Sequence, residues 1–548
     1  MKQSNKFKKR VFYQIYPASF KDSNNDGWGD LNGIRSELPY LKSLGIGIIW
    51  LSPIYASPME DMGYDISDYK AINPLFGTMD DFDNLIKEAN KLDIKIVMDL
   101  VINHTSTEHK WFKEAIKSKD NPYRDYYIIR EGKGKHKNKY PNNWQSAFTG
   151  TAWEKIEGSN DFYLHLYAKN QADLNYKNPK VVKEVESILK FWLDKGVYGF
   201  RCDVINQIYK TSLKNDYTKF LKFRGSKYYL NQDGMFKVLN KIRTDVLDNY
   251  DTFLVGETSE FTVKEANRFL NERCLDMFFE FDHVYADKSK FIPLLKRKFS
   301  VKRLIKPIFK WQNKISWIAL YLENHDQLRS ISRYGSERRY PFESGSLLAT
   351  LLLTLKGSPF IYEGEEIGML NYKNCKISEC KDVASLMATK QVQKLLHINE
   401  KLAWKMVNET INRDHARSPM QWKDDINAGF NNGAETWISV NPNYPIINVE
   451  KEDKDPHSLL NFYRKLIHFR NEDDVLRFGD IHQEIISKEL TTYYRTYKNK
   501  TYLIVLNFGD KKKKYSNILN LKCLISNYSD TINFDAIPPY FAGIYEVI

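Results

Sequence analysis

The sequence contains little cysteine and no long apolar run. Its 548 residues include five cysteines, at positions 202, 274, 375, 380 and 523, and none of them forms a CxxC pair. An odd number without close pairs predicts reduced thiols and a cytoplasmic location rather than a disulfide framework. The most apolar helical stretch, SLLATLLLTLKG at 346–357, is too short to cross a bilayer and predicts a buried helix.

The sequence also lacks a concentrated patch of one charge. Its formal net charge is +13, but the basic residues form short runs such as KFKKR (6–10), KGKHKNK (133–139) and KKKK (511–514). No recognisable nucleic-acid-binding module surrounds these runs, so we expect a solvated surface and neither nucleic acid nor membrane as a partner. The N-terminal stretch is basic but lacks the apolar core of a signal peptide.

Eight apolar, β-rich runs alternate with helical patterns. They are VFYQIYP (11–17), GIIWLSP (47–53), KIVMDLVINH (95–104), GFRCDVI (199–205), TFLVGET (252–258), DMFFEFD (276–282), ISWIALYLENHD (315–326) and SPFIYEGEEIG (358–368). Capping signals between these runs predict three helix starts. They are Thr78 with Asp81 three residues later, Asn178-Pro179 and Asp455-Pro456. Eight such units predict an α/β fold, a closed (β/α)8 TIM barrel.

Two spacings are too long for barrel loops. About 70 residues separate the third strand from its helix, which predicts an inserted subdomain. We expect a barrel from residues 1–104 and 175–475, with the subdomain at 105–174. A second excursion follows the eighth strand, at roughly 369–454. Beyond it the pattern alternates, as in TTYYRTYKNKTYLIVLNF, and predicts a C-terminal antiparallel β-sandwich domain at 476–548.

The strand GFRCDVIN places two charges where apolar side chains belong. Residues two apart in a strand face the same way, so Arg201 and Asp203 share one face while Phe200 and Cys202 share the other. In a barrel the charged pair would point inward near the carboxyl end of the strand, where such barrels keep their active sites. We expect Arg201 to favour the ionised aspartate and lower its pKa.

Other strands end in acids and histidines, at His104, Glu257 and the pair His325-Asp326. Converging carboxylates, without a thiolate, Ser–His pair or P-loop, favour glycosyl chemistry, which needs one attacking carboxylate and one proton donor. Asp203 suits the nucleophile. Glu257 follows apolar residues without an adjacent cation and suits the acid/base. Asp326 would stabilise positive charge developing on the sugar.

DLVINH (99–104), GFRCDVIN (199–206), VGET (255–258) and ENHDQ (323–327) resemble the four signature blocks of the family 13 glycoside hydrolases, the α-amylase superfamily. QIYPASF (14–20), GYDISDY (63–69), GEEIG (364–368) and RSPMQW (417–422) resemble its oligo-1,6-glucosidase and α-glucosidase branch. The resemblance implies the same three roles for Asp203, Glu257 and Asp326. Glu363 departs from it, because glutamine is frequent at that position.

The resemblance further implies a pocket for the non-reducing glucose, with Tyr64 stacking on the ring and Asp61 and Arg417 binding its terminal hydroxyls. The implied substrate-binding residues are Asp61, Tyr64, His104, Arg201, His325 and Arg417, with Phe148 and Tyr167 at the mouth of the pocket. Val204, directly after the nucleophile, goes with α-1,6 linkages in this family. A single methyl group shifts such a preference by only about 1–3 kcal/mol.

The stretch DSNNDGWGD (22–30) places oxygen ligands at alternate positions. They are Asp22, Asn24, Asp26, the Trp28 carbonyl and Asp30. This resembles the first nine positions of an EF-hand loop, but Gly33 replaces the bidentate glutamate at the twelfth. A similar loop in the resembled branch binds calcium, so we expect structural Ca²⁺, with Mg²⁺ as the alternative and a metal-free Asx-turn loop as the competing interpretation.

The leading hypothesis is therefore a retaining, exo-acting α-glucosidase that hydrolyses α-1,6 bonds of isomaltose and short isomalto-oligosaccharides. It would be a monomer without an organic cofactor. Sister specificities remain open: α-1,4-glucosidase, sucrose hydrolase or isomerase, glucan 1,6-α-glucosidase, and trehalose-6-phosphate hydrolase. A phosphorylated substrate would need a Lys/Arg cluster at the pocket. A non-catalytic carbohydrate-binding or partner protein is the distant alternative, and its relatives usually lose the catalytic carboxylates.

Overall fold

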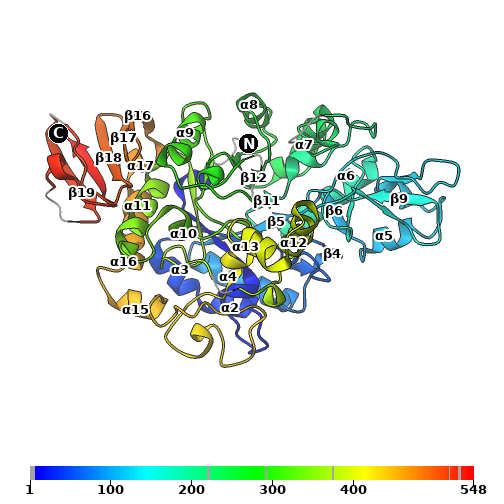
Figure 1. Cartoon of the computed structure of the whole chain (residues 1–548), viewed down its shortest axis with the longest axis horizontal. Helices are drawn as coiled ribbons and strands as arrows, with labels where there is room; N and C mark the ends of the chain where they lie inside the picture. The colour runs from blue at the N-terminus through cyan, green and yellow to red at the C-terminus, as the bar shows by residue number, and fades with distance from the viewer. Residues whose placement is uncertain are drawn as a thin grey trace.

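Eight parallel strands close into a barrel at the centre of the molecule (Figure 1). The computed structural model describes residues 6–548 apart from 219–222, 291, 293, 373–374, 517–518 and 529–531. In barrel order the strands are β1 (Phe12–Ile15), β15 (Ser358–Tyr362), β14 (Ala319–Leu320), β13 (Met277–Phe279), β12 (Phe253–Glu257), β11 (Gly199–Cys202), β5 (Lys95–Leu100) and β2 (Ile48–Leu51). Each of the eight predicted runs contains one barrel strand, so the predicted fold is confirmed.

Helices follow the strands and cover the outside of the barrel. They include α3 (Leu38–Leu44), α4 (Met79–Lys91), α6 (Pro179–Asp194), α7 (Asp233–Asp245), α8 (Val263–Asn271), α9 (Val301–Gln312), α11 (Pro341–Thr354) and α16 (Leu459–Glu472). Thr78 and Asp81 form the predicted capping box of α4, and Asn178 caps α6. The predicted start at Asp455-Pro456 is wrong by three residues, because Ser458 supplies the cap of α16.

Between β5 and α6 the chain leaves the barrel and builds two small antiparallel sheets. One pairs β6 (His104–Ser106) with β10 (Gln171–Asp173), and the other has the order β7 (Ile129–Glu131), β9 (Asp161–Leu164), β8 (Trp153–Lys155). Trp144 and Trp153 are buried in the core of this segment. They therefore pack the segment rather than offering a surface for sugar. The segment lies at the opposite end of the molecule from the C-terminus (Figure 1).

The C-terminal strands form one five-stranded antiparallel sheet in the part of the chain that is described. Its order is β16 (Asp480–Ile486), β17 (Leu490–Tyr497), β18 (Lys500–Asn507), β20 (Ala542–Val547), β19 (Leu521–Ser526). One side contacts the barrel through α9, α11 and α17 (Asp474–Phe478). Tyr515, Ile537 and Phe541 pack on the second core of this domain. The antiparallel domain is confirmed, but the described residues that cover its sheet are irregular chain and barrel helix rather than a second sheet.

Aromatic side chains fill the barrel interior below the active end. Phe12, Trp50, Phe253, Phe279 and Phe360 belong to one buried cluster inside the strands. A barrel packed with aromatic side chains is a solid core and excludes water from the layer above it.

Among the described residues, no helix has the length and apolarity needed to cross a membrane. The five cysteines are free thiols.

Arg470, on α16, ties the last barrel helices to the eighth strand. Its guanidinium donates to the carbonyl oxygens of Leu353 (2.5 Å), Leu355 (3.2 Å) and Gly357 (2.7 Å), at the end of α11 and the turn into β15. Burial and nearby Arg495 lower the pKa of Arg470 to about 9. The side chain therefore acts mainly as a hydrogen-bond donor to a buried helix end.

We predict that Arg470→Ala lowers the free energy of unfolding by about 3 kcal/mol, because buried carbonyl groups lose their donor. The midpoint of urea unfolding checks this. Lys465→Ala, an exposed change on the same helix, is the matched control and should stay within about 0.5 kcal/mol of the parent. Equal midpoints for Arg470→Ala and the parent would contradict the prediction.

Candidate active site

The predicted catalytic residues meet at the carboxyl end of the barrel. Glu257 ends β12, Asp203 follows β11 directly, and Asp326 lies in the loop after β14. They line one pocket with Asp61, Tyr64, His104, Phe148, Tyr167, Gln171, Val204 and Arg413. The remaining predicted residues, Arg201, His325 and Arg417, form a buried layer around it through contacts with Asp203, Tyr64 and Asp326.

Arg201 is the centre of the charged layer. Its Nη1 donates to Asp203 Oδ1 at 2.6 Å and to Asp99 Oδ1 at 2.8 Å, and its Nη2 donates to Glu257 Oε2 at 2.6 Å. The guanidinium also lies over the Trp50 ring, 5.3 Å from its centroid. Arg201 and Asp203 therefore share the inward face of β11 as predicted, and Cys202 packs in the outer core.

Burial dominates the proton affinities of the catalytic pair. Burial raises the pKa of Asp203 to about 6, and Arg201 offsets only part of the rise. Arg201 lowers this pKa as predicted, but burial outweighs it, so the pKa of Asp203 lies above its usual value. Burial also raises the pKa of Glu257 to about 8. The predicted absence of a cation beside Glu257 was wrong, because Arg201 touches it. Near neutral pH, Asp203 is nevertheless mostly ionised and Glu257 mostly protonated.

Asp326 has the opposite electrostatic environment. Burial opposes its ionisation, but His325, Arg413 and Arg417 outweigh burial and hold its pKa well below the usual range. His325 accepts at Nδ1 from Gln14 Nε2 at 2.7 Å, which leaves Nε2 to carry its proton, 3.3 Å from Asp326 Oδ2. Asp326 is therefore a fixed negative charge, as a group that stabilises a cation-like sugar must be.

Arg413 was missed by sequence reasoning. Its Nη2 donates to Asp61 Oδ1 at 3.1 Å and its Nη1 to Asp326 Oδ1 at 3.3 Å, so it closes one end of the pocket. Arg417 lies behind it, with Nη2 3.0 Å from Asp326 Oδ1. The available signal was the spacing of the two arginines in RDHARSPMQW, which puts them about one helical turn apart. Asp99 was missed as well, because it lies inside an apolar strand.

Val204 contributes through its backbone as well as its side chain. Its φ of 39° and ψ of 37° place a β-branched residue in the left-handed region, a strained conformation. In this conformation the Val204 N–H donates to Glu257 Oε2 at 3.2 Å. Val204 thus touches Glu257, the predicted acid/base, directly, which its sequence position alone did not indicate.

Aromatic rings form the side wall of the pocket. Phe148 and Tyr167, both from the inserted segment, pack edge to face at 5.6 Å, and Tyr167 lies 5.6 Å from His104. Tyr64 stacks on His325 with 7° between the rings. Its hydroxyl bonds His325 Nε2 at 2.7 Å, which fixes the ring predicted to carry the sugar.

Glu363 lies beneath the pocket, uncharged. Its Oε2 accepts from the backbone N–H of Tyr16 at 2.8 Å, and burial raises its pKa well above the usual range. Tyr16 in turn stacks on His325 and lies under Arg417. A protonated glutamate offers one donor and one acceptor, much as the glutamine frequent at this position does.

The loop at 22–30 is held by its own hydrogen bonds. Asp22 accepts from the backbone N–H groups of Asn25 (2.6 Å) and Gly27 (2.8 Å), and Asp30 accepts from Ser23 and caps α2 (Leu31–Ser36). Asn24 and Asp26 are exposed and pair with each other. Within the described residues, no group of three or more His, Cys, Asp or Glu is arranged for a metal ion. Hydrogen bonds within the loop engage the side chains of Asp22, Asn24, Asp26 and Asp30 in this conformation, and calcium stays a prediction.

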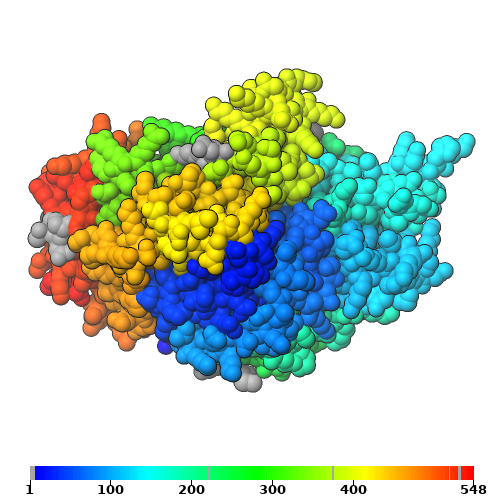
Figure 2. Space-filling model, turned by 90° about the horizontal axis from the view of Figure 1, so that it is seen from below, coloured from blue at the N-terminus to red at the C-terminus, as the bar shows by residue number. Residues whose placement is uncertain are grey.

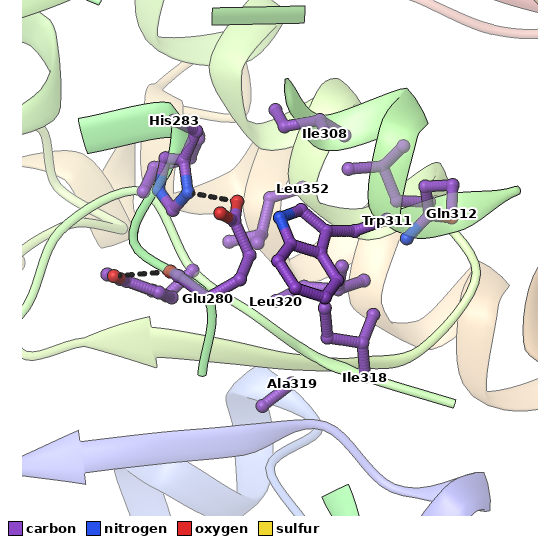
Figure 3. Close-up of a pocket in the computed structure, with 12 residues that line it drawn as sticks. Glu280, His283, Ile308, Trp311, Gln312, Ile318, Ala319, Leu320 and Leu352 are labelled. Atoms are coloured by element: carbon purple, nitrogen blue, oxygen red, sulfur yellow. Dashed lines mark hydrogen bonds and ion pairs between the residues drawn. The ribbon is translucent and has the colours of Figure 1, made fainter. Parts of the chain in front are cut away.

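A second cavity lies in the barrel wall, away from the catalytic residues (Figure 3). It is lined mainly by apolar side chains such as Leu320, Trp311 and Leu352, next to the buried pair formed by His283 Nδ1 and Glu280 Oε1 at 2.5 Å. Its volume of about 20 Å³ suits one water molecule and is too small for a sugar. The cavity is therefore not a candidate for substrate binding.

The fold and the pocket together define a class. A (β/α)8 barrel whose carboxyl end holds paired carboxyl groups of different proton affinity is typical of glycoside hydrolases. The model of the alpha-amylase catalytic domain matches residues 14–479. The chain belongs to the α-amylase family of glycoside hydrolases.

Individual relatives have narrower names. The chain is 43% identical over 568 aligned residues to an oligo-1,6-glucosidase of Parageobacillus thermoglucosidasius, covering 99% of both chains. It is 41% identical to a trehalose-6-phosphate hydrolase of Bacillus subtilis, over 92% of this chain and 89% of that one. The crystal structure of the Bacillus licheniformis trehalose-6-phosphate hydrolase superposes with a TM-score of 0.92 at 40% identity, covering 99% of both chains.

We predict a bell-shaped pH profile for kcat/KM. Activity should rise with pH as Asp203 ionises near pH 6 and fall as Glu257 loses its proton near pH 8. The two apparent pKa values belong to the coupled pair. Initial rates at low substrate concentration across the pH range measure both limbs.

Glu257→Gln is the matched variant for this profile. It should lower kcat by about 10²–10⁴-fold and abolish the alkaline limb, because the proton donor is lost. A profile in which activity keeps rising beyond about pH 9 would overturn the assignment of Glu257 as the proton donor.

Proposed function

We propose that this protein is a retaining, exo-acting α-glucosidase that hydrolyses α-1,6 bonds at the non-reducing end of isomaltose and short isomalto-oligosaccharides. The observation that carries the proposal is the pair Asp203 and Glu257, which share Arg201 at 2.6 Å each and differ in pKa. Each carboxyl group also shifts the pKa of the other, so the two lie near each other. This favours the retaining mechanism, which needs a shorter separation between the carboxyl groups than the inverting one.

The reaction takes two steps. The Asp203 carboxylate attacks the anomeric carbon and forms a glucosyl ester while the Glu257 carboxylic acid protonates the departing oxygen. Glu257, now ionised, takes a proton from water, which attacks the same carbon and releases glucose and the Asp203 carboxylate. Asp326 faces the ring as a constant negative charge and stabilises the cation-like transition state of both steps.

The proposed preference for α-1,6 linkages and for terminal glucose is argued from the residues that form the pocket walls. Val204 lines the pocket beside Glu257, where the leaving sugar must sit. Asp61 and Arg413 close the far end, which favours action on terminal glucose. Four relatives that are 41–43% identical over nearly the whole chain are named oligo-1,6-glucosidases.

Trehalose 6-phosphate hydrolysis is the main competing specificity, since relatives at 40–41% identity bear that name. Arg413 is the one cationic side chain among the described residues that line the pocket. It is already bound by three carboxylates, Asp61, Asp326 and Asp382. Because none of the described lining residues has a cation left for a phosphate group, the pocket favours a neutral sugar. We also propose a cytoplasmic monomer that takes small oligosaccharides.

We predict fastest glucose release from isomaltose when isomaltose, maltose, sucrose, trehalose and trehalose 6-phosphate are compared at equal concentration. Asp203→Ala should lower the rate by more than about a thousandfold, because the attacking carboxylate is lost. A glucose assay on each sugar measures both effects.

Val204→Ala serves as the matched variant in the same assay. It should shift the isomaltose-to-maltose rate ratio toward maltose by about tenfold. Preference for another sugar would keep the mechanism and remove the linkage assignment, whereas an inert parent chain would favour the non-catalytic alternative.

We further propose that the loop at 22–30 binds structural Ca²⁺, which requires the loop carboxylates to turn inward. Adding Ca²⁺ after treatment with a chelator should then raise the melting temperature. At a hundredfold excess of Ca²⁺ over Kd, the free energy of unfolding should rise by about 2.7 kcal/mol. Asp26→Asn, which removes one exposed ligand charge, should weaken this response. Identical melting curves with chelator and with calcium would contradict the proposal.

A further inference from the structure

Arg413 is anchored by a carboxylate that does not line the pocket. Asp382 is 1% exposed, and its Oδ1 accepts from Arg413 Nη2 at 2.6 Å and from Arg413 Nε at 2.8 Å. The two pocket carboxylates are farther from the same guanidinium, Asp61 at 3.1 Å and Asp326 at 3.3 Å. Asp382 therefore makes the closest of the three ion pairs.

The same carboxylate fixes the backbone around Arg413. Its Oδ2 accepts from the Arg413 backbone N–H at 3.2 Å and from Ser385 Oγ at 2.6 Å. Its Oδ1 also accepts from Ala384 N, which makes Asp382 the N-cap of α12 (Val383–Leu396). In return, Asp414 Oδ2 accepts from the Asp382 N–H at 3.3 Å. The start of α12 and the backbone of Arg413 form one hydrogen-bonded unit.

This unit belongs to the excursion after the eighth strand. Helix α12 and helix α13 (Glu400–Asn408) form a hairpin that projects from the body of the molecule, in yellow-green to yellow in Figure 2. The barrel provides none of the Asp382 contacts described above. The position of Arg413 in the pocket therefore depends on how this excursion folds.

The charges explain why an anchor outside the pocket is needed. Asp61 and Asp326 both face the sugar, and both attract the Arg413 guanidinium toward the pocket centre. Gln171 Nε2 holds the other Asp61 oxygen at 3.1 Å. With Asp382 pulling from outside, the guanidinium stays at the closed end, and Asp61 keeps a fixed geometry toward the terminal hydroxyl groups.

We propose that Asp382 is a positioning residue for the cleavage reaction, acting through Arg413 to keep the pocket shaped for a terminal glucose. The proposal rests on the proposed glucosidase function and deepens it. It predicts that loss of the Asp382 charge weakens the binding of the terminal sugar more than it slows the chemical steps, because Asp203 and Glu257 do not touch Asp382.

Asp382→Asn separates this positioning effect from helix capping. Asparagine is as good an N-cap as aspartate, so α12 keeps its start while Arg413 loses its closest charged partner. We expect KM for isomaltose and the inhibition constant of glucose each to rise about tenfold or more, with a smaller change in kcat and an almost unchanged melting temperature. Asp382→Ala should show the same rise in KM and in the glucose inhibition constant. It should also lower the melting temperature, because α12 loses its N-cap.

Asn399→Ala is the matched control. Asn399 caps α13 in the same hairpin through Leu402 N, and no described contact links it to Arg413. Its loss should lower the melting temperature and leave KM and the glucose inhibition constant at parent values. Parent-like KM and glucose inhibition in Asp382→Asn would overturn the proposal, and so would equal kinetic losses in Asn399→Ala.

Direct titration with glucose keeps the test separate from turnover. If the parent chain binds glucose but cleaves no sugar of the panel, the glucosidase function fails while a tenfold weaker affinity in Asp382→Asn still supports the anchor. Equal glucose affinity in the parent and Asp382→Asn counts against the anchor alone. A parent chain that does not bind glucose overturns both.

Discussion

One buried guanidinium shared by three carboxyl groups sets the chemistry of the pocket. Arg201 contacts Asp99, Asp203 and Glu257, and burial raises the pKa of each of these acids. Without the cation all three would favour the protonated form near neutral pH, and no carboxylate would remain for the proposed nucleophilic attack. The pKa of Glu257 nevertheless rises further than that of Asp203, to about 8 against about 6, so Glu257 carries the proton before Asp203 does.

Among the described residues, the pocket and the side chains around it contain more carboxyl groups than guanidinium groups. Six carboxyl groups face three guanidinium groups, namely Asp61, Asp99, Asp203, Glu257, Asp326 and Asp382 against Arg201, Arg413 and Arg417. Such an excess is costly for the empty pocket but favours a sugar that becomes cationic in the transition state. The aromatic floor of the barrel excludes water below this layer and lowers the local dielectric constant, which strengthens that preference.

The parts of this arrangement that follow chain periodicity could be predicted. Because alternate residues of a strand face the same way, Arg201 and Asp203 could be placed on one inward face. The recurrence of acids at strand ends located the pocket. Arg413 and Asp382 could not be found in this way, because tertiary packing brings an excursion far along the chain onto the barrel mouth. The effect of burial on the Asp203 pKa, which outweighs the predicted effect of Arg201, was missed for a related reason. The degree of burial depends on contacts that no local pattern encodes.

The residues proposed to cleave the bond and those proposed to choose the sugar lie mostly on different parts of the chain. Barrel strands and the short loops after them supply Asp203, Glu257 and Asp326, whereas the inserted segment and the excursion supply the wall and the closed end. The excursion also reaches the loop at 22–30, where Trp437 stacks on Trp28. Phe148, Tyr167 and Arg413 lie on these insertions and can change without disturbing the contacts of Arg201, whereas Asp61 and Val204 follow barrel strands. Such changes fit the finding that relatives of nearly equal identity, 43% and 41%, bear names for different sugars on one fold.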